Sequence, residues 1–224
     1  MGSNHNLWKS IGAGLALTLA TAGAQANLIV NGGFETPDID TVVGERGSTS
    51  STWQYYNASE VEGFEGSNIE LWNSGFNGVE SFEGEQFLEL NSHPTPGSAF
   101  SIFQEFDTVA GQSYNVSFAY RARANDREMF NVDLSSAGGF SLLSENVDDH
   151  TTSEWSIFSG LFTATDSATT ITFTSIIPET HTIGNFLDDV KVEAVPELNA
   201  ASGSVAMFLA LGLMSLVRER KIKR

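Results

Sequence analysis

Residues 113–121 read Ser-Tyr-Asn-Val-Ser-Phe-Ala-Tyr-Arg and give the strongest indication of the fold. Aromatic or β-branched residues alternate with small or polar residues along this stretch. An alternation with a period of two places the apolar side chains on one face of a β-strand. Residues 113–121 are therefore predicted to form a strand with one buried face.

The rest of residues 27–195 has no segment with helical periodicity. Short runs of β-branched and aromatic residues are separated by Gly, Ser, Asn and Asp, which is typical of a β-sandwich. Between residues 36 and 65 the periodicity fades, which predicts long surface loops. Nine strands in one domain fit an all-β jelly-roll sandwich. Besides residues 113–121, strands are expected at residues 28–34, 69–73, 86–90, 98–106, 130–134, 154–164, 169–176 and 184–193.

Both ends of the chain carry targeting patterns. A lysine, a short apolar run and a small-residue cleavage pattern predict a secretory signal helix over residues 1–26. Residues 198–217 carry no charge, and a helix of this length would be about 30 Å long, enough to span a bilayer. The basic residues 218–224 would remain on the cytoplasmic side. These patterns predict a single transmembrane helix in a tail over residues 196–224, after a domain over residues 27–195.

The charge is unevenly distributed. The whole chain has 28 acidic and 11 basic residues and a net charge of −17. Residues 27–195 hold 26 acidic and five basic residues, which gives this part a net charge of −21. Such a domain is a poor partner for nucleic acid, whose phosphates require Lys and Arg. The absence of cysteine excludes disulfides, a thiol nucleophile and a thiolate metal site.

The C-terminal pattern resembles a PEP-CTERM-type sorting signal. Val195-Pro196-Glu197 precedes an apolar segment and an Arg/Lys-rich end, and Leu198 stands where the usual signal has a second proline. The resemblance is therefore to a variant of the signal. It implies a Gram-negative bacterial protein that an exosortase-type enzyme sorts to the cell surface, with at least transient anchoring in the inner membrane.

The order of segments within residues 27–195 resembles the galactose-binding-domain-like superfamily, which includes carbohydrate-binding modules. The resemblance rests on Asn31-Gly-Gly-Phe-Glu35, Ile69-Glu-Leu-Trp72, Glu83-Gly-Glu-Gln-Phe-Leu-Glu-Leu90, Ala110-Gly-Gln-Ser-Tyr114 and Leu187-Asp-Asp-Val190. It implies a β-sandwich with a structural calcium ion and, often, glycan binding.

The resemblance places the calcium ion between the first and last strands, with ligands from Gly33, Glu35 and Asp188. Oxygen ligands of this kind suit Ca²⁺. Asp188 has the same parity as Val190 and Val192, so its side chain is expected to point inward and to need a partner or an ion. The alternative is that Glu35 and Asp188 cap turns or contact arginines.

Glycan binding usually combines an aromatic ring that stacks on the sugar with polar groups that bond its hydroxyls. Trp53 and Tyr55 are aromatic candidates in the polar region, and Trp72 stands beside Glu70; core packing remains the alternative for both tryptophans. Two cations at the end of a predicted strand can donate forked hydrogen bonds. The candidate ligand-binding residues are Trp53, Tyr55, Trp72, Arg121 and Arg123.

No catalytic motif is recognisable in the sequence. Acidic runs are expected on a solvated face, the histidines are isolated, and neither a nucleophile elbow nor a His-Glu-x-x-His helix is present. The sequence predicts a non-enzymatic, exported protein that binds glycan in the extracellular matrix or at the cell surface. A structural surface protein without a ligand is the alternative, and a glycan hydrolase is a third.

Overall fold

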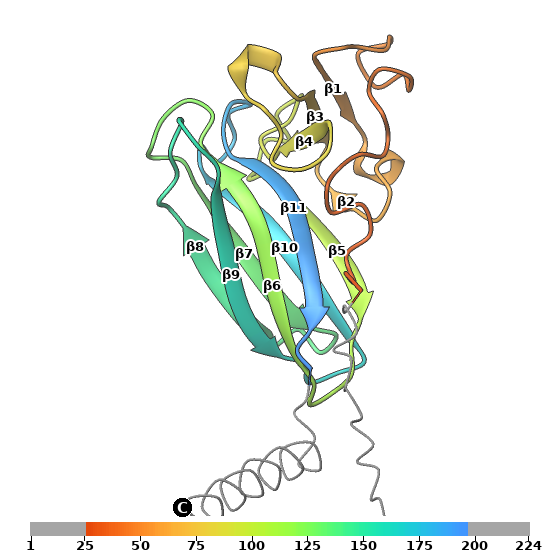
Figure 1. Ribbon diagram of the computed structural model, residues 1–224, viewed down its shortest axis with the longest axis vertical. Coiled ribbons are helices and arrows are strands. Elements are labelled where there is room, and N and C mark those ends of the chain that lie inside the picture. Colours follow the sequence, from red (N-terminus) through yellow and green to blue (C-terminus); the bar gives the residue numbers. More distant parts are fainter. Residues whose placement is uncertain (1–25, 197–224) are drawn as a thin grey trace, which may run out of the picture.

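The computed structural model describes residues 26–196, which form two antiparallel sheets packed face to face (Figure 1). The predicted signal helix and C-terminal helix lie outside these residues, as does nearly all of the predicted sorting signal. Within residues 26–196 no helix is long and apolar enough to cross a membrane.

Sheet A has six strands in the order β1-β3-β4-β11-β6-β9. Its strands are β1 (Trp53–Tyr56), β3 (Ile69–Asn73), β4 (Gln86–Glu89), β11 (Phe186–Ala194), β6 (Ser113–Arg121) and β9 (Ser156–Thr163). Sheet B has five strands in the order β2-β5-β10-β7-β8. Its strands are β2 (Glu65–Gly66), β5 (Ser101–Asp107), β10 (Ala168–Ile177), β7 (Met129–Ser136) and β8 (Ser141–Val147). Two short 3₁₀ turns, η1 (Ala58–Glu60) and η2 (Phe76–Gly78), complete the elements of this part of the chain.

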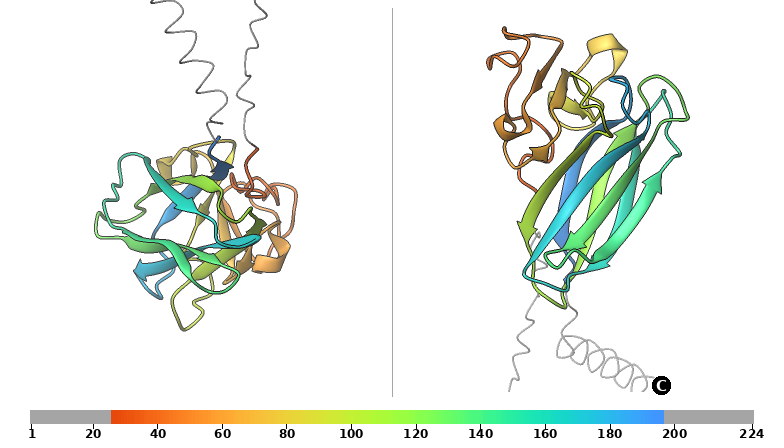
Figure 2. Two further views of the ribbon diagram at one scale, coloured as in Figure 1. Left: turned by 90° about the horizontal axis from the view of Figure 1, so that it is seen from below. Right: turned by 180° about the vertical axis from the view of Figure 1, so that it is seen from behind.

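The large core fills the space between the sheets, which the left view of Figure 2 shows from one end of the sandwich. The alternation predicted for residues 113–121 is confirmed in β6: Tyr114, Val116 and Phe118 are buried in this core. Ile171 and Phe173 of β10 enter it from the opposite sheet. The all-β sandwich predicted from the sequence is therefore confirmed.

The prediction of a strand at residues 28–34 was wrong. Asn31 and Phe34 have φ values of 54° and 56°, which a strand does not accommodate, and the segment turns instead. It still follows the last strand, because Leu28 N donates to Val192 O and Val190 N donates to Gly32 O. Gly32 allows this approach, since a Cβ there would lie 2.0 Å from Val190 O.

Two regions of strand were not expected. β1 lies within residues 36–65, which were predicted to be loops, β2 begins at the last of these residues, and no strand was predicted at β8. β1 is only four residues long, and in β8 Leu142 and Leu143 are consecutive and both half-buried. The sequences of β1 (Trp-Gln-Tyr-Tyr) and β8 lack the regular alternation of apolar and polar residues that makes β6 recognisable.

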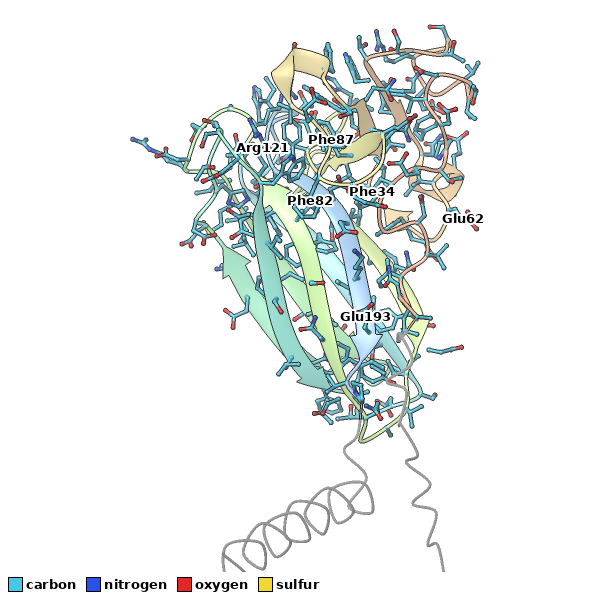
Figure 3. All side chains as sticks on the ribbon, viewed as in Figure 1. Phe34, Glu62, Phe82, Phe87, Arg121 and Glu193 are labelled. Carbon is cyan, nitrogen blue, oxygen red and sulfur yellow. The ribbon has the colours of Figure 1, made fainter. Side chains whose placement is uncertain are left out.

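The described residues begin and end at the same end of the sandwich, whereas β1, β3 and β4 lie at the opposite end (Figure 1). Figure 3 shows Phe87 of β4 near this second end and Glu193 of β11 near the first.

Candidate functional site

The outer face of sheet A carries an unusual set of aromatic and charged side chains. Direct pairing places Tyr55, Glu70, Glu89, Phe186 and Arg121 in one row across five strands. A second row contains Trp53, Trp72 and Phe87. The residues between these positions, such as Leu71 and Leu88, enter the large core. The aromatic and charged residues therefore face away from that core.

Trp53, Tyr55 and His93 form a group that we call the aromatic platform. The ring centroids of Trp53 and Tyr55 are 6.4 Å apart, those of Trp53 and His93 are 5.2 Å apart, and those of Tyr55 and His93 are 6.2 Å apart. The angles between the ring planes are 22°, 32° and 36°, so the rings are close to parallel. All three side chains are half-buried.

Arg46 adds a cation to the platform. Its guanidinium carbon lies 4.1 Å from the centroid of the Trp53 ring, within the range of a cation–π interaction. Its Nη1 donates to Trp53 O at 2.6 Å, which fixes the side chain against β1.

A buried carboxylate, that of Glu70, orients one ring of the platform. Glu70 is 1% exposed, and its Oε2 lies 2.7 Å from His93 Nδ1. Its Oε1 accepts from Trp72 Nε1 at 2.9 Å. Glu70 thus holds one histidine of the platform and one tryptophan of the adjacent strand in fixed orientations.

Glu89 is the cross-strand neighbour of Glu70 and is also fully buried. Arg123 Nη1 donates to both of its carboxylate oxygens, at 2.5 and 2.6 Å, and Gly184 N donates to Oε1 at 2.9 Å. Burial and the nearby Glu70 raise the pKa of Glu89 well above its usual value, while Arg123 acts in the opposite direction. Because both buried glutamates bond to the protein itself, they are positioned as structural groups.

Trp72 belongs to a second, smaller core. It is 2% exposed and packs with Phe76, Phe87 and Phe186, at centroid distances of 4.7, 6.0 and 5.0 Å. The guanidinium carbon of Arg123 covers it at 4.5 Å from the ring centroid. The expectation that Trp72 contacts a ligand is therefore corrected to the core-packing alternative.

The five predicted ligand-binding residues are thus divided by the structure. Trp53 and Tyr55 come together with His93, whereas Arg123 is bonded to Glu89. Arg121 lies at the far end of its row and donates to Thr152 O. It is shown near the platform-bearing end of the molecule in Figure 3. The predicted set is therefore not a single site.

The residues predicted to bind calcium, Gly33, Glu35 and Asp188, lie around the loop that precedes β4. Glu35 Oε1 accepts from the backbone N–H groups of Glu85 and Gln86, at 2.9 and 3.0 Å. A Cβ at Gly33 would lie 2.5 Å from Glu83 Oε2, so this glycine lies directly against the same loop. The loop is therefore fastened to the segment that begins the domain.

Asp188 is buried as predicted, but not on the expected face. The register of β11 shifts between Asp188 and Lys191, where Asp189 has a φ of 51°, so that Leu187 and Val190 both enter the large core. This bulge breaks the parity that was predicted to align Asp188 with Val190. Asp188 Oδ2 accepts from Phe82 N and Glu83 N, at 2.8 and 3.0 Å. Burial raises its pKa to about 7.

The carboxylates of Glu35 and Asp188 accept hydrogen bonds from backbone N–H groups. Within residues 26–196 no group of three or more His, Asp or Glu side chains is placed to hold a metal ion. A structural calcium ion at Gly33, Glu35 and Asp188 stays a prediction of the resemblance.

Sequence reasoning missed His93 and Arg46 as members of the platform. His93 follows β4 by four residues and Arg46 precedes β1 by seven, so no local pattern connects them to Trp53. For the buried residues next to the platform, the sequence signal was a spacing of two residues. This spacing puts Glu70 and Trp72 on one face of a strand, and likewise Phe87 and Glu89.

Residues 27–193 match the DUF642 family, which is described as a protein family of unknown function. The chain therefore belongs to the DUF642 family. A search of curated proteins gave no match.

Several solved structures are similar to this chain. TmCBM61 in complex with β-1,4-galactotriose is 18% identical, with a TM-score of 0.48, and the match covers 76% of this chain and 100% of the other. The CBM22-1 xylan-binding domain of Xyn10C from Paenibacillus barcinonensis is 12% identical, with a TM-score of 0.38 over 69% and 90% of the two chains. A family 16 carbohydrate-binding module is 13% identical, with a TM-score of 0.40 over 74% and 99%.

Proposed function

We propose that this chain is an exported, surface-sorted protein that binds extracellular glycan through the aromatic platform. The observation that carries the proposal is the arrangement of Trp53, Tyr55 and His93, three half-buried rings that lie close to parallel. The apolar C–H face of a pyranose ring packs on aromatic surfaces of this kind, while its hydroxyls need polar partners at the rim.

Polar groups of this type surround the rings. Arg46 lies over Trp53 and can donate to a sugar hydroxyl from the nitrogens that do not bond Trp53 O. Glu70 engages Nδ1 of His93, which leaves Nε2 on the opposite side of the ring. Because Glu70 and Trp53 fix the orientation of His93, the platform is preorganised and loses little entropy on binding.

The cellular part of the proposal rests on the two terminal patterns. Residues 1–26 would direct export, and residues 196–224 would anchor the chain in the inner membrane until an exosortase-type enzyme processes it. The described ends of the domain lie opposite the strands that carry Trp53 and Trp72, so an anchored domain would present the platform away from the membrane (Figure 1).

A polysaccharide array probed with the full chain tests the function, followed by titration calorimetry with the best-bound glycan. We expect Trp53→Ala to reduce affinity at least about tenfold, since stacked aromatic residues dominate binding energy. Phe140→Ala is the matched control, because Phe140 is 74% exposed on the loop before β8, and it should bind like the unmodified chain. Equal affinity of the Trp53→Ala and unmodified chains would reject the platform. No binding to any glycan would favour the structural alternative.

Calcium is not required by this proposal. If a calcium ion binds at Gly33, Glu35 and Asp188, EDTA should lower the melting temperature of the full chain, and Glu35→Gln should remove that response. An unchanged melting temperature in EDTA would contradict the calcium prediction and leave the glycan proposal untouched.

A further inference from the structure

Strand β9 is an edge of sheet A that is not protected against pairing. It pairs with β6 alone, over eight residues without a register shift, and forms one margin of the sheet in Figure 1. Its sequence, Ser-Ile-Phe-Ser-Gly-Leu-Phe-Thr, contains no charge and no proline. Ile157 and Leu161 are 64% and 69% exposed. Long, regular and apolar edges of this kind are sites where another strand can add.

The other edges of the two sheets are protected. In β1, Glu45 N bonds Tyr55 O and Arg46 Nη1 bonds Trp53 O, so the preceding loop covers the carbonyls of its free edge. β2 has only two residues. β8 carries Glu145, and its pairing with β7 contains a register shift. Charges, short strands, bulges and covering loops are the usual ways of preventing edge pairing, and β9 has none of them.

The free backbone groups of β9 can be assigned from the ladder. Ala164 N donates to Gln112 O, and the register pairs Ser113 with Thr163, so hydrogen-bonded pairs recur at every second residue from Ala164. The N–H and C=O groups of Phe162, Gly160 and Phe158 thus point to β6. Those of three alternate residues point to the free edge: Ile157, Ser159 and Leu161.

A groove of about 640 Å³ separates this edge from β8, the nearest strand of the other sheet. Residues 157–161 line one side of the groove, and Leu143, Glu145 and Val147 of β8 lie on the other. Leu143 packs against Gly160, where a Cβ would lie 2.8 Å from Leu143 Cδ1, but no strand of the described residues pairs with the free backbone groups of β9.

We propose that β9 pairs with β9 of a second copy of this chain, antiparallel about a two-fold axis at Ser159. In this register Ser159 faces the partner's Ser159, and Ile157 faces the partner's Leu161 in both directions. All of these positions direct their backbone groups to the free edge, so the strand is complementary to itself. Such a pairing would join two six-stranded sheets into one continuous sheet, with an isologous interface.

The charge of the domain restricts where a second copy can meet it. Two domains of charge −21 repel each other, and β9 offers a contact of eight residues without a charge. Asp148 and Asp149 line the groove before the start of β9. Antiparallel pairing places the corresponding aspartates of the two copies at opposite ends of the shared strands, where they do not face each other.

Sedimentation velocity and hydrogen exchange of the full chain test the pairing. We expect a reversible, concentration-dependent dimer, with slower exchange at the amides of Ile157, Ser159 and Leu161 as concentration rises. A chain that stays monomeric at every concentration overturns the proposal and would leave the edge for a strand of another protein. A dimer in which these three amides exchange at the same rate as in the monomer also overturns it.

Two double variants test the register. Ile157→Lys with Leu161→Lys places like charges opposite each other in both directions and should raise the dissociation constant at least about tenfold. Ile157→Lys with Leu161→Glu places Lys opposite Glu and should restore association. Both positions are exposed, so neither change disturbs the core. Val109→Lys, at a 67% exposed turn position, is the control and should have no effect. If the Lys/Lys variant associates as strongly as the unmodified chain, the proposal is overturned. Association through the terminal segments would give that result, because it does not depend on β9.

Discussion

Trp53 and Trp72 are direct cross-strand neighbours on the outer face of sheet A, but they lie in different environments. Trp72 is enclosed by phenylalanines and by Arg123, whereas Trp53 is half-buried and packs beside Tyr55 and His93. The difference follows from strand order. β3 has β1 on one side and β4 on the other, while β1 is the edge strand. The same side chain on the same face is therefore enclosed in one strand and half-buried in the next.

The largest effect should come from Trp72→Ala. Removing a buried tryptophan leaves a cavity among Phe76, Phe87 and Phe186 and deprives Glu70 of a donor. We expect the free energy of unfolding of the full chain to fall by about 3–5 kcal/mol, measured by urea denaturation. A loss below about 1 kcal/mol would mean that Trp72 is not part of a packed core, and the comparison would fail.

Arg123→Met should have the second largest effect. The change leaves the carboxylate of Glu89 buried, with Gly184 N as a remaining donor and Glu70 as a neighbour. Removing one member of a buried ion pair is costly, but the Arg123 side chain is 22% exposed, so we expect a loss of about 2 kcal/mol. Adding Glu89→Gln removes the unpaired charge and should recover part of this loss in the same denaturation assay. If Glu89→Gln destabilises the Arg123→Met chain further, the buried pair has been misassigned.

His93 and His150 extend the comparison of a half-buried with a buried residue to the pH dependence of stability. His93 joins the half-buried platform and lies against Glu70, whereas His150 is buried between Tyr120 and Phe130, at centroid distances of 5.2 and 5.3 Å. Neither ring nitrogen of His150 has a hydrogen-bond partner. Burial lowers the pKa of His150, against the opposing influence of Glu128, Asp149 and Asp148.

The lowered pKa of His150 in the folded state determines the direction in which stability changes with pH. Below the unfolded pKa of about 6.5 the unfolded chain binds more protons than the folded chain, so folding becomes less favourable as pH falls. This contribution can reach about 1.4 kcal/mol per pH unit until pH falls below the pKa of the folded state. His150→Phe should therefore reduce the loss of stability between pH 7.5 and pH 5.5, relative to the unmodified chain. His181→Gln, at an exposed position, is the control, and an equal response of the two variants would refute the assignment.

The sequence predicted strands that carry a clear apolar pattern, such as β6, and failed where another strand or loop determines the conformation. Tyr114, Val116 and Phe118 show their burial in the local pattern, because β6 has one face in the core. The turn at Asn31 and Phe34 and the bulge at Asp189 depend on positive φ values, which are stabilised by long-range contacts. No local pattern reveals such contacts.

The candidate site was predictable only in part for the same reason. Trp53 and Tyr55 were recognised because they are aromatic residues in a polar region of the sequence. His93 could not be associated with them, because β1–β3 pairing and the bond to Glu70 bring it into place from a distant segment. Trp72 and Trp53 also look equivalent in sequence, since strand order, which separates their roles, is a property of the whole sheet.

The smallest effect on stability should come from Trp53→Ala, which completes the comparison with Trp72. Trp53 is half-buried at the edge of the sheet, and its loss removes ring contacts with Tyr55 and His93 without opening a closed cavity. We expect the free energy of unfolding to change by about 1 kcal/mol or less in the same urea assay, although glycan affinity should fall. A destabilisation as large as that of Trp72→Ala would show that the platform is a structural cluster. In that case the two neighbouring tryptophans would have one role, and the proposed binding site would have to lie elsewhere on the domain.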